Sequence, residues 1–271
     1  MDNVNYREYR PGDVPALSLL WRDVFGDSLR LIANFFALLP DMGSYVVAEE
    51  DGVLLGGAGI LNGFELVTRK KQRPVVAYLY AVMVREEERG RGIGKGLCLE
   101  AEKLARRRES ELLTTLPAGP SLYGWYRRLL GLECVLHRKR FETGCAPREP
   151  VMEMTSTEYQ LWRDNLLKGR AYLRPSPPTM EFARRFCQSL GGGLYACSSG
   201  ICTAYLDGET CFIKELITNR PEDAPLIAAS VGAELGARVA VWYLPAREGE
   251  AYLAAKPGAI PADCVWNLTF D

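Results

Sequence analysis

The sequence predicts an α/β protein in which helices flank a mixed central sheet, followed by a second, smaller α/β domain. Three observations support this fold class. The chain has 271 residues, which is more than a single domain usually contains. Segments with strand and helix patterns alternate along its first half. The most apolar strand is followed by a glycine-rich loop and an amphipathic helix, as in α/β folds.

The first half supplies the predicted sheet and its helices. Leu17, Leu20 and Val24 recur at helical spacing, and residues 74–84 are almost continuously apolar, as expected of a central strand. The expected elements are a strand at 5–9, helices at 13–24 and 29–39, a hairpin of strands at 45–48 and 53–61, a strand at 74–84, a helix at 93–108, a strand at 112–116, a helix at 123–130 and a strand at 134–141.

Residues 143–150, with charges, one glycine and two prolines, are predicted to be a linker. They separate a first domain at 1–143 from a second at 151–271. The second is expected to contain helices at 156–167 and 179–190, strands at 193–197, 201–206 and 210–217, a helix at 222–235, and strands at 238–244 and 264–270. This order resembles that of the first domain, so we expect a degenerate internal repeat.

The composition excludes several function classes. Lys and Arg number 33 against 34 Asp and Glu, so the net charge is −1. Nucleic-acid-binding domains are usually strongly basic, and we therefore expect no nucleic-acid partner. Apolar runs such as residues 77–84 are far shorter than the ~18 residues that span a bilayer. With a polar N-terminus unlike a signal peptide, we expect a cytoplasmic protein without a membrane partner.

The eight cysteines are predicted to be reduced thiols that fill apolar space in the core. No two of them form a C-x-x-C pair, and His137 is the single histidine. A zinc site of the Cys/His type or a histidine-based catalytic triad would have to be built around that one residue. We therefore expect neither a metal nor a triad.

A glycine-rich loop begins the helix predicted at 93–108. Glycines occupy every second position from Gly90 to Gly96. Such a loop turns tightly and presents successive backbone N–H groups, at a helix N-terminus, to a phosphate. The dinucleotide pattern G-x-G-x-x-G fails, because its last glycine would fall on Lys95 or Leu97. The P-loop pattern fails because it would place its first glycine on Arg89 and its hydroxyl residue on Gly96.

The loop does contain the pattern R-x-x-G-x-G, at Arg89, Gly92 and Gly94, after the strand YLYAVMV. Further along, the aromatic–tyrosine pair Trp125–Tyr126 comes shortly before Gly131. With these three features in this order, the chain resembles the GNAT N-acetyltransferases, which use acetyl coenzyme A. The resemblance spans most of residues 1–143 and is sharpest at 78–133. It implies a GNAT-like mixed sheet with acetyl-CoA as acetyl donor.

The resemblance also implies how the donor is bound. In the family the strand that follows splays away, which leaves main-chain groups without a partner, and these hold the pantetheine arm and the acetyl carbonyl. The loop amides bind the pyrophosphate and basic side chains add charge. The residues so implied are Val82, Met83, Val84, Arg89, Gly90, Arg91, Gly92, Ile93, Gly94 and Lys95.

Tyr126 resembles the family's tyrosine that protonates the departing thiolate. Its phenol, with an ordinary pKa of about 10, can donate a proton to a strong developing anion. Four residues separate Tyr126 from Gly131, one more than in the common pattern. Tyr123, about one helical turn earlier, therefore stays as an alternative.

The family's usual reaction is direct attack by an amine, so no nucleophilic residue is required and Cys98 is interpreted as packing. The general base is left open among Glu49, Glu50, Glu65, Tyr80 and a water relay. The acceptor is expected to be a small-molecule or protein amine.

The second domain is predicted to be a non-catalytic, acetyltransferase-like domain that shapes the acceptor cleft or a homodimer surface. An unrelated α+β domain is the alternative. Where a repeat of the glycine loop would fall, the chain has Pro221, Glu222 and Asp223, whose acidic groups repel phosphate. An alternative function is a regulatory protein that binds acetyl-CoA without turnover. A nucleotide-binding module is disfavoured by the missing hydroxyl after Lys95.

Overall fold

The computed structural model describes residues 4–70, 72–266, 268 and 270. It divides into two compact units, which are described separately. Unit 1 comprises Met1–Leu66, Arg73–Val135 and Leu253–Ile260, and unit 2 comprises Val67–Gln72, Leu136–Tyr252 and Pro261–Asp271. These units interleave along the chain, whereas the predicted domains at 1–143 and 151–271 are consecutive. The division into folding domains stays a prediction.

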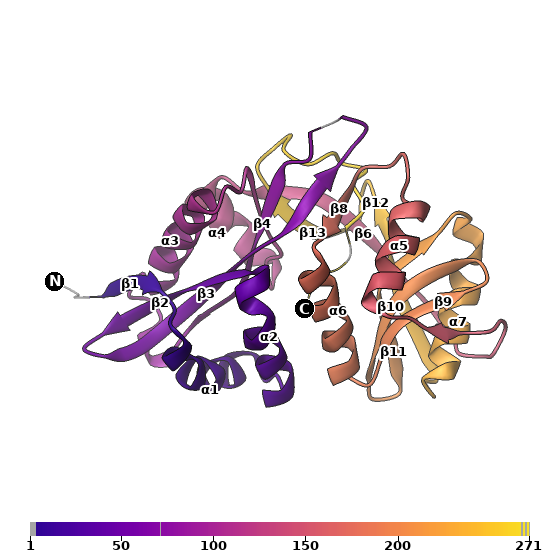
Figure 1. The fold of residues 1–271 in the computed structure, drawn as a ribbon, viewed down its shortest axis with the longest axis horizontal. Helices are drawn as coiled ribbons and strands as arrows, with labels where there is room; N and C mark the ends of the chain where they lie inside the picture. Colours follow the sequence, from indigo (N-terminus) through magenta and orange to yellow (C-terminus); the bar gives the residue numbers. More distant parts are fainter. Residues whose placement is uncertain (1–3, 71, 267, 269, 271) are drawn as a thin grey trace. The chain divides into compact units, whose positions relative to one another are not determined.

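Unit 1 is built on a mixed sheet (Figure 1). Its neighbouring strands are, in order, β1 (Asn5–Glu8), β2 (Gly43–Glu50), β3 (Val53–Val67), β4 (Val75–Val84), β5 (Leu112–Thr115) and β13 (Glu250–Ala255). All these neighbours are antiparallel except β4 and β5, which run parallel. A parallel pair needs a crossover connection, and the glycine loop lies in it.

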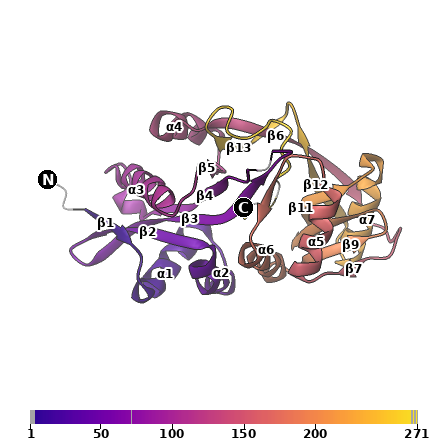
Figure 2. The same ribbon diagram turned by 45° about the horizontal axis from the view of Figure 1, so that its top comes forward.

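Helices cover both faces of this sheet. They are α1 (Val14–Phe25), α2 (Leu29–Met42), α3 (Ile93–Arg107) and α4 (Pro120–Leu130), with short 3₁₀ turns η1 (Pro11–Asp13) and η2 (Glu86–Glu88). Figure 2 shows α1 and α2 on one face and α3 with α4 on the other. The apolar side of α3, with Leu97 and Ala101, packs on Ala77 and Leu79 of β4 in one core cluster. Burial of this stripe holds the loop end of α3 against the sheet.

Unit 2 contains β6 (Glu133–Gly144), β7 (Met152–Glu153), α5 (Ser156–Leu166), β8 (Tyr172–Pro175), α6 (Pro177–Ser189), β9 (Gly193–Cys197), β10 (Gly200–Asp207), β11 (Thr210–Thr218), the turn η3 (Pro221–Asp223), α7 (Ala224–Glu234) and β12 (Val239–Ala246). Its strands are neighbours in the order β6, β12, β11, β10, β9, β7. Only the β11–β12 pair is parallel.

The two sheets have the same topology. The series β1 to β5 of unit 1 corresponds to β7, β9, β10, β11 and β12 of unit 2, with the parallel pair in the same place. The sixth strand of each sheet comes from the other half of the sequence: β13 pairs with β5, and β6 pairs with β12. The degenerate repeat expected from element order is therefore present, and the exchanged strands explain why the units interleave.

Some expected elements differ from the structure. Three short strands, β7, β8 and β13, were not predicted. A strand was expected at 264–270, but its described residues contribute a single bridge, between Val265 and Tyr172, and positions 267 and 269 lie outside the described residues. The helix expected at 222–235 begins as the turn η3, and α7 starts at Ala224.

A fully buried ion pair joins a helix and a strand of unit 2. Arg163 of α5 and Glu215 of β11 are both 0% exposed. The guanidinium donates to both carboxylate oxygens, at 2.8 and 3.0 Å, and the Tyr159 hydroxyl donates to the same carboxylate at 3.2 Å. Since Glu215 lies beside Leu216, which faces α7, the pair places α5 on the opposite face of the sheet.

We predict that Arg163→Met lowers the free energy of unfolding by about 3–5 kcal/mol, because it leaves the Glu215 carboxylate buried without its counter-ion. The control is Arg238→Met, which breaks the 3.2 Å pair with Glu209 whose side chains are 76% and 73% exposed. That change should cost at most about 1 kcal/mol. Urea unfolding of both variants measures the difference, and equal losses would contradict the prediction.

Candidate functional site

The glycine loop connects β4 to α3 and is exposed. The turn η2 follows β4, and the chain then passes Gly90, with φ +87°, and Gly92, with φ +83°. Both values lie in the left-handed region that side chains with a Cβ rarely adopt. No atom lies within 4 Å of the position that a Cβ at either glycine would take, so the loop opens to its surroundings.

The helix that follows begins with a bare N-terminus. Gly92 is the N-cap of α3, and no side chain caps the helix there. The first backbone N–H groups of a helix have no partner within it, and the helix dipole adds partial positive charge at this end. This end of α3, from Ile93 to Lys95, therefore suits an anion.

The basic residues of the loop divide into two kinds. Arg91 is held by Glu50, with two bonds of 3.0 Å, and by Glu88, so its charge is already compensated. Arg89 of the loop and Lys95 in the first turn of α3 are both exposed. We infer that Arg91 fixes the loop to β2, while Arg89 and Lys95 supply the charge that an anion would meet.

The strand β4 loses its neighbour on one side before it ends. Its pairing with β5 runs from Val76–Leu112 to Leu79–Thr115 and stops there. On its other side, β4 still pairs with β3, and the Arg85 N–H donates to the Leu55 carbonyl at 2.9 Å.

Backbone groups of successive strand residues point to alternate sides. Since Arg85 bonds to β3, the N–H and C=O of Met83 also face β3. Those of Val82 and Val84 face the side on which β5 has ended. Of the three β4 residues expected to hold the donor, the structure thus directs the main chain of Val82 and Val84 outward and that of Met83 inward.

A bulge in β4 sets which side chains face α3. Ala77 and Leu79 lie in the core cluster under α3, and after the bulge Val82 and Val84 pack against that cluster instead of Ala81 and Met83. The register with β3 shifts between Gly57–Met83 and Gly59–Tyr80, and Ala81 has φ +48°. One inserted residue therefore reverses the alternation.

Tyr126 of α4 is buried in the core, 6% exposed, and is hydrogen-bonded to Thr115 at the end of β5. Burial, together with the neighbouring Cys98, raises the pKa of Tyr126 above its ordinary value, and a hydrogen bond with Thr115 partly opposes this rise. The phenol consequently keeps its proton at neutral pH and is available as a donor. Tyr123, the alternative, is only half-buried.

The structure does not gather the candidate bases around Tyr126. Glu49 is bonded to Arg7 at 2.5 Å and Glu50 to Arg91. Glu65 lies 3.9 Å from Arg73, near the C-terminal end of β3. The fourth candidate, Tyr80, packs its ring against Trp21 and Phe35, with centroids 5.7 and 5.6 Å apart. Its side chain belongs to the aromatic core beneath α1 and α2.

Two residues at this site were missed by sequence analysis. The Thr115 hydroxyl donates to the Leu79 carbonyl at 3.0 Å, where β4 and β5 part, and also contacts Tyr126. The Tyr45 hydroxyl donates to the Ala81 carbonyl at 2.6 Å. Both roles depend on strand register, for which the sequence carries no local signal.

Cys98 is fully buried, and burial raises the pKa of its thiol to about 12. A thiol with this pKa is not a nucleophile at neutral pH, which fits its interpretation as packing. Among the described residues, no group of His, Cys, Asp and Glu side chains is arranged to hold a metal ion. Within the same residues, no helix is long and apolar enough to span a bilayer.

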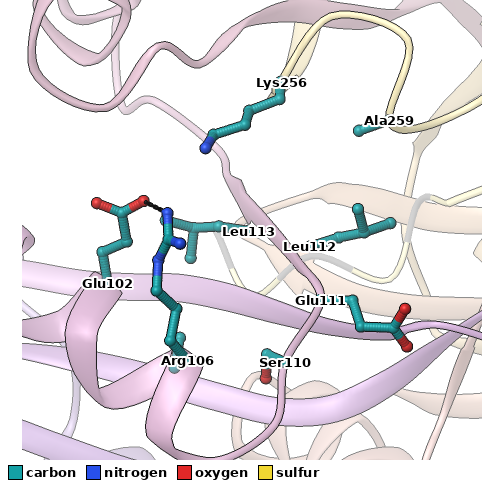
Figure 3. Close-up of a pocket in the computed structure, with 9 residues that line it drawn as sticks. Glu102, Arg106, Ser110, Glu111, Leu112, Leu113, Lys256 and Ala259 are labelled. Atoms are coloured by element: carbon teal, nitrogen blue, oxygen red, sulfur yellow. Dashed lines mark hydrogen bonds and ion pairs between the residues drawn. The ribbon is translucent and has the colours of Figure 1, made fainter.

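A separate pocket lies at the opposite end of α3 (Figure 3). It is lined by Glu102, Ala105, Arg106, Ser110, Glu111, Leu112, Leu113, Lys256 and Ala259. Arg106 is bonded to Glu102 at 2.9 Å, and the two acidic and two basic residues of the lining balance in charge. None of the residues expected to bind the donor lines this pocket.

Comparisons with known proteins identify the family of unit 1. Residues 14–132 match the family model described as Acetyltransferase (GNAT) family. They form a GNAT domain. Comparison with curated protein sequences found no match.

Solved structures extend the similarity in fold to the second half of the chain. The chain is 17% identical to a GCN5-related N-acetyltransferase from Kribbella flavida, with a TM-score of 0.68 over 94% of this chain and 71% of that protein. For a GCN5-related N-acetyltransferase from Anabaena variabilis the values are 14%, 0.66, 93% and 72%. A tandem GNAT protein from the clavulanic acid biosynthesis pathway is 13% identical, with a TM-score of 0.57 over 93% of this chain and 97% of that protein. The predicted fold class is confirmed.

Proposed function

We propose that the protein is an N-acetyltransferase that transfers the acetyl group of acetyl-CoA directly to an amine. One observation carries this proposal: the uncapped start of α3 lies beside the part of β4 whose outward main chain has lost β5 as a neighbour. An anion site next to free strand edge groups suits a ligand with a pyrophosphate and an amide-containing arm. The GNAT family of unit 1 supports acyl transfer as the reaction.

In the proposed complex, amides from Gly90 to Lys95 bind the pyrophosphate. Arg89 and Lys95 add charge, while Arg91 holds the loop in place through Glu50 and Glu88. The main chain of Val82 and Val84 pairs with the pantetheine arm and the acetyl carbonyl.

The proposed reaction needs no covalent enzyme intermediate. The neutral amine nitrogen attacks the thioester carbonyl carbon, the carbon–sulfur bond breaks, and the thiolate leaves. Tyr126 gives its phenolic proton to the sulfur, and the proton lost by the amine nitrogen passes by way of water to the phenolate, which restores Tyr126. The acceptor class is a small-molecule or protein amine.

The experiment that tests the proposal combines calorimetry with acetyl-CoA and an assay of free thiol with a panel of amines. We expect binding of acetyl-CoA and amine-dependent release of coenzyme A. Binding without turnover of any amine would instead favour the regulatory protein. No binding of acetyl-CoA would refute both functions.

We predict that Gly92→Asp weakens acetyl-CoA binding by well over tenfold, about 1.4 kcal/mol or more, because it puts a negative charge where amides face an anion. Calorimetry measures the affinity. Gly208→Asp is the matched control, since Gly208 also has positive φ, at +58°, and open space at its Cβ, but lies in the β10–β11 turn. Equal affinity of the two variants for acetyl-CoA would show that the loop does not bind the pyrophosphate.

We predict that Tyr126→Phe lowers kcat by about 10²–10⁴-fold, the usual contribution of a general acid, and leaves acetyl-CoA affinity within a few-fold. The ring is kept, so only the proton donor is lost. Because burial holds the pKa of Tyr126 above its ordinary value of about 10, any loss of wild-type activity through ionisation of this phenol should have its midpoint above pH 10. Tyr123→Phe is the control; if it alone is inactive, Tyr123 is the acid.

We predict that one acetyl-CoA binds per chain. In unit 2, the segment between β11 and α7 has the turn Pro221–Asp223 in place of the glycine loop, and Asp223 is the N-cap of α7. Its carboxylate is bonded to Arg220 at 2.8 Å and would repel a phosphate. A calorimetric titration that gives two acetyl-CoA molecules per chain would contradict this expectation.

A further inference from the structure

The Tyr45 side chain connects two strands that are not neighbours. Tyr45 belongs to β2 and is 0% exposed, and its hydroxyl donates to the Ala81 carbonyl of β4 at 2.6 Å. The strand β3 lies between β2 and β4. The tyrosine ring therefore has to cross β3 to reach the bulge.

Two glycines of β3 make this crossing possible. Gly59 pairs directly with Tyr45, and Gly57 lies two residues before it on the same face. A Cβ at Gly57 would overlap Cε1 of the tyrosine ring, and one at Gly59 would lie 3.2 Å from Cε2. Any larger residue at Gly57 would displace the ring, so glycine at this position serves the contact with Ala81.

The hydrogen bond fixes a backbone conformation that alanine disfavours. Ala81 has φ +48°, which brings its Cβ close to its own backbone. Burial raises the pKa of the Tyr45 phenol well above its ordinary value, so the hydroxyl remains a donor to the Ala81 carbonyl at all physiological pH values.

The bonded carbonyl belongs to the same planar peptide as the Val82 N–H. In a trans peptide the C=O and the N–H point in opposite directions. Holding the Ala81 carbonyl toward Tyr45 thus directs the Val82 N–H to the opposite side, where β5 has ended. A donor on the carbonyl also polarises the peptide and strengthens its N–H as a donor.

We propose that Tyr45 is a positioning residue for acetyl transfer: by holding the Ala81 carbonyl, it aims the Val82 N–H at the carbonyl oxygen of the acetyl group. This inference rests on the proposed function. If Tyr45 has this role, removal of its hydroxyl changes the environment of the thioester carbonyl. A purely structural role would change only the stability of the fold.

Tyr45→Phe tests the assignment because it keeps the ring and removes only the hydroxyl. We expect kcat to fall by roughly 10-fold to 100-fold, as for a small misplacement of a reacting group. Affinity for acetyl-CoA should fall relative to affinity for coenzyme A, which lacks the acetyl group. In isotope-edited infrared spectra, the carbonyl stretch of bound acetyl-CoA should move toward its value in free solution.

A control and a rescue separate positioning from stability. Tyr159→Phe removes another buried, bonded hydroxyl, in unit 2, and should lower stability without moving the carbonyl stretch. Glycine adopts positive φ without strain, so Ala81→Gly in the Tyr45→Phe background should restore part of the lost kcat. If Tyr45→Phe does not fold, Gly57→Ala displaces the ring and should shift the stretch in the same direction.

The outcomes distinguish this inference from the function on which it rests. Wild-type protein that neither binds nor turns over acetyl-CoA would refute the proposed function. Active wild-type protein would support that function. An unchanged kcat and carbonyl stretch in folded Tyr45→Phe, or in Gly57→Ala if that variant replaces it, would then overturn the role of Tyr45 alone.

Discussion

The bulge in β4 is the constraint on which the rest of the site depends. A strand alternates its side chains between two faces and its backbone groups between two edges. One extra residue at Ala81 therefore changes the face to which every later side chain of β4 points. It turns Val82 and Val84 toward the α3 core, and leaves their main chain at the edge where β5 has ended. The loop and the start of α3 then follow within a few residues. The uncapped start of α3 and the edge of β4 that β5 has left are thereby brought together.

Unit 2 keeps this architecture but has the turn Pro221–Asp223 in place of the glycine loop. Its β11 also carries one extra residue, Lys214, where the register with β10 passes from Ala204–Ile213 to Thr203–Glu215. Ile213 and Leu216 accordingly face the same core, as Leu79 and Val82 do in unit 1. The bulge is thus a property of the duplicated fold, whereas the glycine loop is present in one copy. The fold and the glycine loop therefore vary independently between the two units. Core packing constrains the fold, whereas the loop depends on backbone amides at the surface.

Sequence analysis predicted most of the fold because its signals are local. The apolar run of β4 and the glycines before α3 identify strand, loop and helix within twenty residues. By contrast, β13 pairs with β5 across more than a hundred residues, and its own six residues have no distinctive pattern. The role of Tyr45 could not be predicted either, because only the strand register shows that its side chain passes over Gly57 to Ala81. The residues implied to bind the donor remain predictions, although their placement is compatible with one ligand.

Because the sixth strands are exchanged, the second half of the sequence supports the candidate site of unit 1 through strand pairing. This support requires no contact with a substrate. Ala254 of β13 pairs with Thr115 and belongs to the core beneath α3. Thr115 in turn bonds the Leu79 carbonyl and the Tyr126 phenol at the point where β4 and β5 part. Without β13, β5 would have an unpaired edge and Thr115 would lose the neighbour that holds it. A fragment ending near residue 143 keeps every residue implied to bind the donor, yet lacks this strand. Composition places a domain boundary at the predicted linker, residues 143–150. The site of unit 1, however, also depends on β13, which lies beyond that boundary.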